Sequence, residues 1–411
     1  MPKLTRKKLA TSQTLTKRDL AEILRTEGRS ISAEDGDGLK TFARWLVNAN
    51  IKKFTARVDV SNQDIIRVLT RVKHPGPVRE VVKSWLVTRL FKRSRQADNT
   101  APYFLAQPDD EEDLIAAGNL MAADEAEMGV TSNRALLQAV VHFSRGDVDT
   151  AYVKYDEMRK GLLAGEYVGP HTQGALSIRS LGEFSQVIDA ARLGQSIRAP
   201  IQFERSQHFT EKKSIVVIGV DPVYHDRYAA RMVDSVNGAF NIHFHVCNPG
   251  NMTFLNGDNV RYSLEINPAA TAPFYATMRF LALRQILQTY EAPVMTMDAD
   301  SVSNGEVAGL FNILPDFDIA LNTSKDSRGV LPWRFLIAQV VGANPTEAAH
   351  EFWRSFEAQF DHLMAQDGGV TWYVDQALLT STLLLTQQRQ PQTRLLVRGL
   401  SSLSGTTQSK V

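Results

Sequence analysis

The chain has 411 residues, of which 43% are hydrophobic and 22% are charged, and its formal net charge is +1. This length suits two or three domains, and this composition is typical of a globular protein, which excludes a disordered one. The single cysteine, Cys247, excludes an internal disulfide and a zinc site built on several cysteines, and its apolar surroundings predict a core residue. No apolar run approaches the roughly 20 residues that span a bilayer, and no secretory signal is visible, so we expect a cytoplasmic protein without a transmembrane segment.

The charge is distributed unevenly along the chain. Residues 1–100 contain 22 Lys and Arg against 10 Asp and Glu, a balance of +12, so the remainder carries 24 against 35, or −11. This asymmetry predicts an anionic partner for the basic region, such as nucleic acid, a membrane surface or an acidic protein. The alternative is a solvated surface that faces the acidic segment "DDEEDLIAAG" next in the chain.

Helical signals fill the first 200 residues. Residues 79–96, "REVVKSWLVTRLFKRSRQ", place apolar side chains at helical spacing with basic residues between them, and we expect a basic helical region over residues 1–100. Over residues 101–200 we expect helical hairpins. There, Gly146-Asp147 and Gly182-Glu183 each precede a helical pattern and lie 36 residues apart, which is similar to the period of tetratricopeptide repeats. A plain helical bundle explains the same pattern.

The pattern changes near residue 200. We expect a polar linker over 201–213, a catalytic domain over 214–390 and a polar tail over 391–411. In the catalytic domain, β-branched apolar runs such as "SIVVIGVD" and "APVMTM" alternate with helical patterns such as "YATMRFLALRQIL". This alternation predicts an α/β fold with a mostly parallel sheet, in which ligands bind at the carboxyl ends of the strands.

Two aspartates follow one of these predicted strands directly. In "APVMTMDADSVSNG", the apolar run ends at Met297 and is followed by Asp298 and Asp300. Two carboxylates at one strand end repel each other unless a cation lies beside them, and oxygen ligands suit Mg²⁺ or Mn²⁺. The triplet alone says little, since "DGD", "DVD" and "DFD" also occur in this chain. The alternative is that one aspartate caps a turn.

From residue 214 to about 385 the chain resembles nucleotide-sugar glycosyltransferases of the GT-A fold, in particular glycogenin-type and related bacterial enzymes. The resemblance rests on the order of five segments: "GVDPVY", "IHFHVC", "YATMRFLALRQIL" running into "VMTMDADSV", "LPWRFLIAQVV" and "WYVDQALL". It implies a GT-A-like sheet in the C-terminal half, preceded by an all-α region, and a hexosyltransferase that retains the anomeric configuration.

The resemblance also implies roles for seven residues. Asp298 and Asp300 would bind Mn²⁺ or Mg²⁺, which bridges the diphosphate of a nucleotide-sugar donor, with uridine as the expected base. Arg279 would face the phosphates, the alternative being a surface salt bridge. The remaining four residues would meet the nucleotide (Asp221, Tyr224) and the reacting sugar or the acceptor (Asp375, Gln376). A capping role for Asp375 at a helix start is an alternative.

The chain departs from the family pattern at one point. Glycogenin-type enzymes use a histidine near the C-terminus as a third metal ligand, whereas no histidine follows Asp375 here. We expect the acceptor to be a glycan, a protein or a small molecule, bound with help from the N-terminal helices. The competing hypotheses are a non-catalytic interaction protein with a degenerate nucleotide-sugar domain, and a basic nucleic-acid-binding protein.

Overall fold

The computed structural model of the chain describes residues 62–71, 77–93, 106–129, 131–166, 174–194, 198–204, 209–211, 213–236, 238–303, 308–323, 331–366, 370–400 and 406–408. The chain forms two compact units, one of Met1–Lys92 with Ala106–Thr172 and the other of Arg93–Leu105 with Gln173–Val411. Residues 1–61 of the predicted basic region lie outside the described residues, so its anionic partner stays a prediction.

The first unit is helical in its described part. Its elements are α5 (Asn62–Arg71), α6 (Pro77–Arg89), β1 (Phe91–Arg93), β2 (Ala106–Pro108), α7 (Glu111–Met128), α8 (Ser132–Ser144) and α9 (Val148–Leu163). Helices α8 and α9 pack against each other as a hairpin, and β1 and β2 form a two-stranded sheet. The N-cap residues Asp110, Thr131 and Asp147 each accept hydrogen bonds from backbone N–H groups in the first turn of α7, α8 and α9.

A charged cluster lies inside this unit. Lys83 is completely buried, and its ammonium group lies 2.7 Å from Glu80 and 2.5 Å from Asp124. The Asn133 side chain donates to Glu80 at 2.6 Å. A buried ammonium group needs such partners, because an isolated charge is expensive to remove from water. The cluster joins α6, α7 and α8.

The second unit is built on an eight-stranded sheet with the order β11-β9-β10-β7-β4-β5-β6-β3. Its strands are β3 (Gln202–Glu204), β4 (Ile215–Val220), β5 (Asn241–Cys247), β6 (Val260–Glu265), β7 (Val294–Met297), β9 (Ile319–Thr323), β10 (Leu336–Ala343) and β11 (Leu395–Arg398). The central strands β7, β4, β5 and β6 pair in parallel, and β11 is parallel to β9, whereas β10 and β3 are antiparallel to their neighbours. The predicted α/β fold with a mostly parallel sheet after an all-α region is confirmed.

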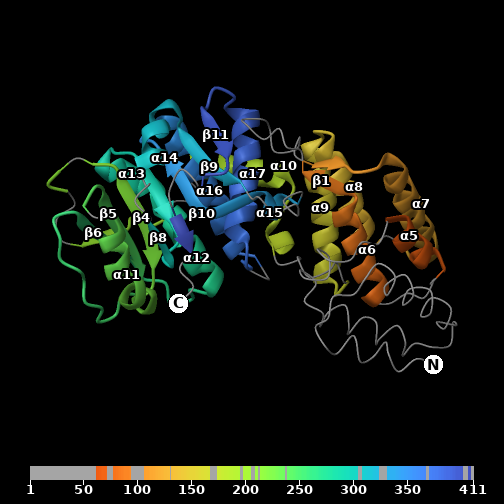
Figure 1. The fold of residues 1–411 in the computed structure, drawn as a ribbon, viewed down its shortest axis with the longest axis horizontal. Helices are drawn as coiled ribbons and strands as arrows, with labels where there is room; N and C mark the ends of the chain where they lie inside the picture. The colour runs from red at the N-terminus through yellow and green to blue at the C-terminus, as the bar shows by residue number, and fades with distance from the viewer. Residues whose placement is uncertain are drawn as a thin grey trace. The chain divides into compact units, whose positions relative to one another are not determined.

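Helices cover both faces of this sheet (Figure 1). They are α10 (Leu181–Arg192), α11 (Pro222–Val236), α12 (Ala272–Leu281), α13 (Leu283–Tyr290), α14 (Ala308–Ile313), α15 (Pro332–Phe335), α16 (Glu347–Met364) and α17 (Val374–Arg389), together with the 3₁₀ turns η2 (Gly174–Ser177) and η3 (Leu314–Asp316). Within the described ranges, every helix is too short or too polar to cross a lipid bilayer.

The central strands β4, β5 and β7 are buried on both faces, as expected of parallel strands between two helical layers. On β4, Val216, Ile218 and Val220 pack in one core with Met232 and Val236 of α11. Gly219, between Ile218 and Val220, lies against α12. Cys247 at the end of β5 is fully buried, which confirms it as a core residue, and this burial raises the pKa of its thiol to about 11.

The strand β4 carries a glycine where α12 comes closest. A Cβ atom on Gly219 would lie 3.1 Å from the backbone nitrogen and the Cβ atom of Arg279. Because glycine has no Cβ, α12 can pack directly against the backbone of β4 at this point. This close approach brings Arg279 to the carboxyl end of β4.

The limits of the second unit differ from the predicted boundaries. Helix α10 belongs to this unit and packs on α16, burying Leu181, Phe184 and Ile188, so the second of the two Gly-acid pairs lies outside the helical unit. Strand β3, inside the predicted linker, pairs with β6. The predicted polar tail supplies β11, in which Leu396 and Val397 are buried, and β12 (Thr406–Gln408), which pairs with β8 (Ser301–Ser303). Short apolar pairs inside polar sequence gave no strand signal.

Candidate functional site

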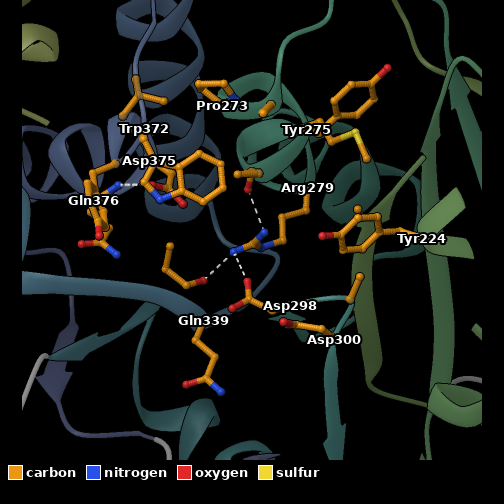
Figure 2. A pocket seen from close by; sticks show the side chains of 18 of the residues that line it. Tyr224, Pro273, Tyr275, Arg279, Asp298, Asp300, Gln339, Trp372, Asp375 and Gln376 are labelled. Atoms are coloured by element: carbon orange, nitrogen blue, oxygen red, sulfur yellow. Dashed lines mark hydrogen bonds and ion pairs between the residues drawn. The ribbon is translucent and has the colours of Figure 1, made fainter. Parts of the chain in front are cut away.

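A pocket of about 510 Å³ opens at the carboxyl ends of β4 and β7 (Figure 2). Its walls come from the ends of these strands, the first turn of α11, helix α12, the middle of β10 and the start of α17. All seven residues singled out in the sequence line it: Asp221, Tyr224, Arg279, Asp298, Asp300, Asp375 and Gln376. The structure therefore brings them together, while the role of each stays a prediction.

Asp298 is held by Arg279. The guanidinium Nη2 of Arg279 lies 2.6 Å from Asp298 Oδ1, and the arginine side chain is only 6% exposed. The same guanidinium donates to the carbonyl oxygens of Ala276 at 2.7 Å and Ala338 at 2.9 Å, and it lies 4.5 Å from the centre of the Phe280 ring. The alternative of a surface salt bridge is met by an ion pair in which the Arg279 side chain is buried, and most donors of Arg279 are occupied by the protein itself.

Asp300 interacts electrostatically with Asp298. The pKa of Asp300 is raised, first by burial and second by the negative charge of Asp298, while Arg279 acts in the opposite direction. A pair of carboxylates in this state is suited to a cation. Their oxygens are the ligands that Mg²⁺ and Mn²⁺ prefer, and such ions keep open positions for phosphate or water. In the described ranges, no third His, Cys, Asp or Glu completes a metal-binding group.

Asp375 lies in the first turn of α17 and is 8% exposed. Burial raises the pKa of its carboxyl group to about 6, against the opposing effect of Arg279. The carboxylate accepts a hydrogen bond from the backbone N–H of Gln376 at 2.8 Å, whereas the N-cap position itself is Tyr373. Asp375 therefore stabilises the first turn without being its cap, and it leaves acceptor capacity for a ligand.

The Gln376 side chain is anchored to the backbone of α15 and of the start of β10. In the orientation that satisfies its surroundings, its amide nitrogen donates to the carbonyl oxygens of Trp333 and Leu336, each at 3.1 Å. Both amide hydrogens are then used, so the carbonyl oxygen is the atom left for a ligand.

Asp221 and Tyr224 lie at the start of α11. Asp221 Oδ1 accepts a hydrogen bond from the backbone N–H of Tyr224 at 2.7 Å, so part of this carboxylate is used to begin the helix. The Tyr224 ring is 48% exposed, and its centre lies 5.4 Å from the centre of the Tyr228 ring. An exposed aromatic ring on a pocket wall offers a flat surface on which a nucleobase can stack.

The pocket also contains residues that sequence reasoning missed. The register between β10 and β9 shifts between Ile337 and Val341, and this irregularity places Gln339 in the lining. The signal that could have identified it is a glutamine inside the apolar run "LIAQVV". Trp372 also lines the pocket and is 46% exposed. Its position directly before the segment "VDQ" could have identified it.

No known protein family matches the chain, and no curated protein is similar to it in sequence. Comparison with solved structures finds glycosyltransferases. The glycosyltransferase GlyE of Streptococcus pneumoniae TIGR4 matches in two structures, at 16% and 18% identity and a TM-score of 0.30; the match covers 45% of this chain and 45% of GlyE. Mouse xyloside xylosyltransferase 1 matches at 12% identity and a TM-score of 0.29, over 45% of this chain and 84% of the mouse protein.

The TM-scores are low and the chain spans less than half the length of GlyE, so these similarities carry no argument about fold or activity. The fold class rests on the sheet topology. The class of site that the residues define is an acidic pocket at the carboxyl edge of a mostly parallel sheet, with an exposed aromatic ring at the start of α11.

Proposed function

We propose that the chain is a metal-dependent glycosyltransferase that moves a hexose from a nucleotide-diphosphate sugar, with UDP as the expected nucleotide, to an acceptor hydroxyl. The observation that supports this most is the meeting of Asp298, Asp300 and Asp375 in one pocket with the exposed ring of Tyr224. Among the described residues, the aspartates of the "DVD" and "DFD" triplets lie outside this pocket. Asp318 of the "DFD" triplet, for example, is bound by the Arg394 side chain at 2.9 Å.

The reaction explains why these groups would gather. The bond between the anomeric carbon and the diphosphate breaks and leaves its electron pair on the diphosphate, while the acceptor oxygen bonds to the anomeric carbon and releases its proton. A bound Mn²⁺ or Mg²⁺ would stabilise the charge on the leaving diphosphate as a Lewis acid. Asp298 and Asp300 would hold that ion, and Arg279 would keep Asp298 in place for it.

The other residues would bind and orient the substrates. Tyr224 would stack on the base, and Asp221 would accept hydrogen bonds from the nucleoside. Asp375 and the free carbonyl oxygen of Gln376 would face the transferred sugar. Transfer with retention of configuration is part of the proposal through the glycogenin-like resemblance.

One observation favours a second candidate function. In the described ranges, the aspartate pair has no third metal-binding residue, which would suit a protein that holds a nucleotide sugar without turning it over. The basic nucleic-acid-binding hypothesis concerns residues 1–100, of which the first 61 lie outside the described residues.

The donor site can be tested by calorimetric titration of UDP, with and without Mn²⁺, into the wild type and Asp298→Ala/Asp300→Ala. We expect binding that requires Mn²⁺ and disappears in the double variant. The matched control is Asp234→Ala/Asp258→Ala, which removes two exposed carboxylates outside the pocket and should bind UDP like the wild type. If the wild type fails to bind UDP with or without metal, the proposal is wrong.

A further inference from the structure

The order of strands in the sheet determines the order in which the lining residues follow one another across the pocket. In the sheet, β7 lies between β4 and β10. The end of β4 leads to Asp221 and Tyr224, the end of β7 to Asp298 and Asp300, and β10 carries Gln339. The proposed nucleoside contacts, the proposed metal-binding carboxylates and the wall formed by β10 therefore follow one another across the sheet.

The start of α17 lies at the β10 end of this row. Helix α17 packs against β10 and α15, and Trp372 and Asp375 stand at its first turn. Figure 2 shows Trp372 on the side of Asp375 and Gln376, with Tyr224 across the pocket. The pocket thus has one exposed aromatic ring on each side of the aspartate pair, and only the ring of Tyr224 has a role in binding the donor.

The residues on either side of Trp372 are fixed by contacts and by backbone conformation. Tyr373, the next residue, has a left-handed backbone with φ 72° and ψ 13°, which is unusual for a residue other than glycine. The guanidinium of Arg334 lies 4.7 Å from the centre of the Tyr373 ring. On the other side of Trp372, the Thr371 hydroxyl lies 3.3 Å from that of Ser177. With both neighbours fixed, the indole is presented to the pocket instead of being packed inside.

We propose that Trp372 is the platform on which the acceptor binds, and that the acceptor is a carbohydrate whose pyranose ring stacks on the indole. This inference rests on the proposed function. One face of a pyranose ring consists of C–H groups, and its rim carries hydroxyls. An exposed indole beside hydrogen-bonding groups matches both parts. Gln339 lines the same pocket and supplies such a group.

Burial separates the acceptor from the transferred sugar. The transferred hexose is attached to the diphosphate and so belongs beside the aspartate pair, where Asp375 is 8% exposed. Trp372 is 46% exposed, which places it where a second molecule enters. A hydroxyl oxygen of the stacked sugar then bonds to the anomeric carbon, the bond to the diphosphate breaks with its electron pair on the diphosphate oxygen, and the hydroxyl proton passes to that oxygen.

The test compares Trp372→Ala with Trp372→Phe and the wild type, all as full-length chains saturated with Mn²⁺ and UDP. Each is applied to a printed array of oligosaccharides, and UDP affinity is measured by calorimetry in parallel. We expect the wild type to bind a subset of glycans, Trp372→Ala to bind them about tenfold more weakly, and Trp372→Phe to retain most of the binding. UDP affinity should stay the same in all three, and thermal unfolding should show that each variant is folded.

The other outcomes overturn the inference in distinguishable ways. If UDP binds and the wild type captures no glycan, or Trp372→Ala captures glycans equally well, a carbohydrate acceptor on Trp372 is wrong while the donor site stands. If Trp372→Ala loses UDP binding as well, the indole serves the donor. If the wild type does not bind UDP at all, the proposed function itself fails.

Discussion

Arg279 forms an ion pair with Asp298, one of the two carboxylates proposed to bind the metal. It lies beneath the pocket on α12 and ties Asp298 to the backbone of β10 through the carbonyl oxygen of Ala338. The sequence placed Arg279 near the phosphates as a possible clamp. In the structure its Nη1 and Nη2 groups donate to the carbonyl oxygens of Ala276 and Ala338, and its role toward the phosphates stays a prediction. A buried cation in this position keeps Asp298 in one orientation and offsets the charge of the pair.

Replacing Arg279 by Met should therefore lower both stability and metal affinity. Removing one partner of a buried ion pair leaves an uncompensated charge, and we expect a loss of about 3 kcal/mol in the free energy of unfolding, measured by urea denaturation. Mn²⁺ affinity, followed by electron paramagnetic resonance of the free ion, should fall as well, and Arg279→Lys should lie between.

The control for this prediction is Lys213→Met, which breaks an exposed pair with Glu211 and should leave stability within experimental error. Wild-type stability in Arg279→Met would show that the ion pair is not needed. A loss of UDP affinity with unchanged Mn²⁺ affinity would instead indicate that Arg279 binds the phosphates of the donor.

At the scale of elements, β5 and β6 carry a buried row of hydrogen-bonded polar side chains on the face opposite α11. His243 Nε2 lies 2.7 Å from Ser263 Oγ, which lies 2.9 Å from His245 Nδ1, and His245 Nε2 lies 3.2 Å from Glu265 Oε2. At the other end, the Tyr290 hydroxyl lies 2.9 Å from His243 Nδ1. Burial lowers the pKa of His243 well below its usual value, and the charge of His245 adds to the effect.

This buried row of hydrogen-bonded side chains predicts that the protein loses stability in acid. The unfolded state takes up a proton on His243 below about pH 6.5, whereas the folded state resists it, so the contribution is complete above that pH and is lost as the pH falls toward the folded pKa. The slope is about 1.4 kcal/mol per pH unit for one such histidine.

The variant that isolates this effect is His243→Asn. Urea denaturation from pH 8 to pH 5 should show a shallower decline below pH 6.5 than in the wild type, whatever the difference in stability at pH 8. Parallel profiles for the two proteins would contradict the assignment.

The elements that were predicted and those that were missed differ in a physical way. Strands such as Ile215–Val220 and Val294–Met297 are continuous apolar runs between turn residues, so their pattern indicates a buried strand without further context. The site aspartates follow from those strand ends. The shifted register of β10 and the edge strand β11 both depend on pairing with β9, another segment of the chain, so no local pattern marks them. The exposed indole of Trp372 likewise depends on the left-handed backbone of Tyr373.

At the scale of the whole molecule, the pocket belongs to one unit. Every residue that lines it lies between Gly219 and Gln376, inside the unit that contains Gln173–Val411. The sheet, its helices and the core on β4 and α11 all lie in the same unit. The proposed donor site therefore consists of residues of the second unit alone.

We expect a fragment of residues 173–411 to bind UDP in the presence of Mn²⁺ with an affinity close to that of the full chain. Calorimetry of this fragment, with residues 1–172 as the complementary control that should not bind, tests the division. A folded 173–411 fragment that fails to bind UDP, when the full chain binds it, would show that the first unit contributes to the donor site.

The central claim is that the pocket turns over a nucleotide sugar, and the most direct measurement is the release of UDP from a panel of UDP-hexoses incubated with the full chain. Water can serve as the acceptor, so the unknown acceptor is not required. We predict Mn²⁺-dependent release of UDP from at least one donor, and its loss in Asp298→Asn/Asp300→Asn. No release from any donor that binds, or release that persists in the double variant, would contradict the claim and favour a protein that holds the donor without reacting it.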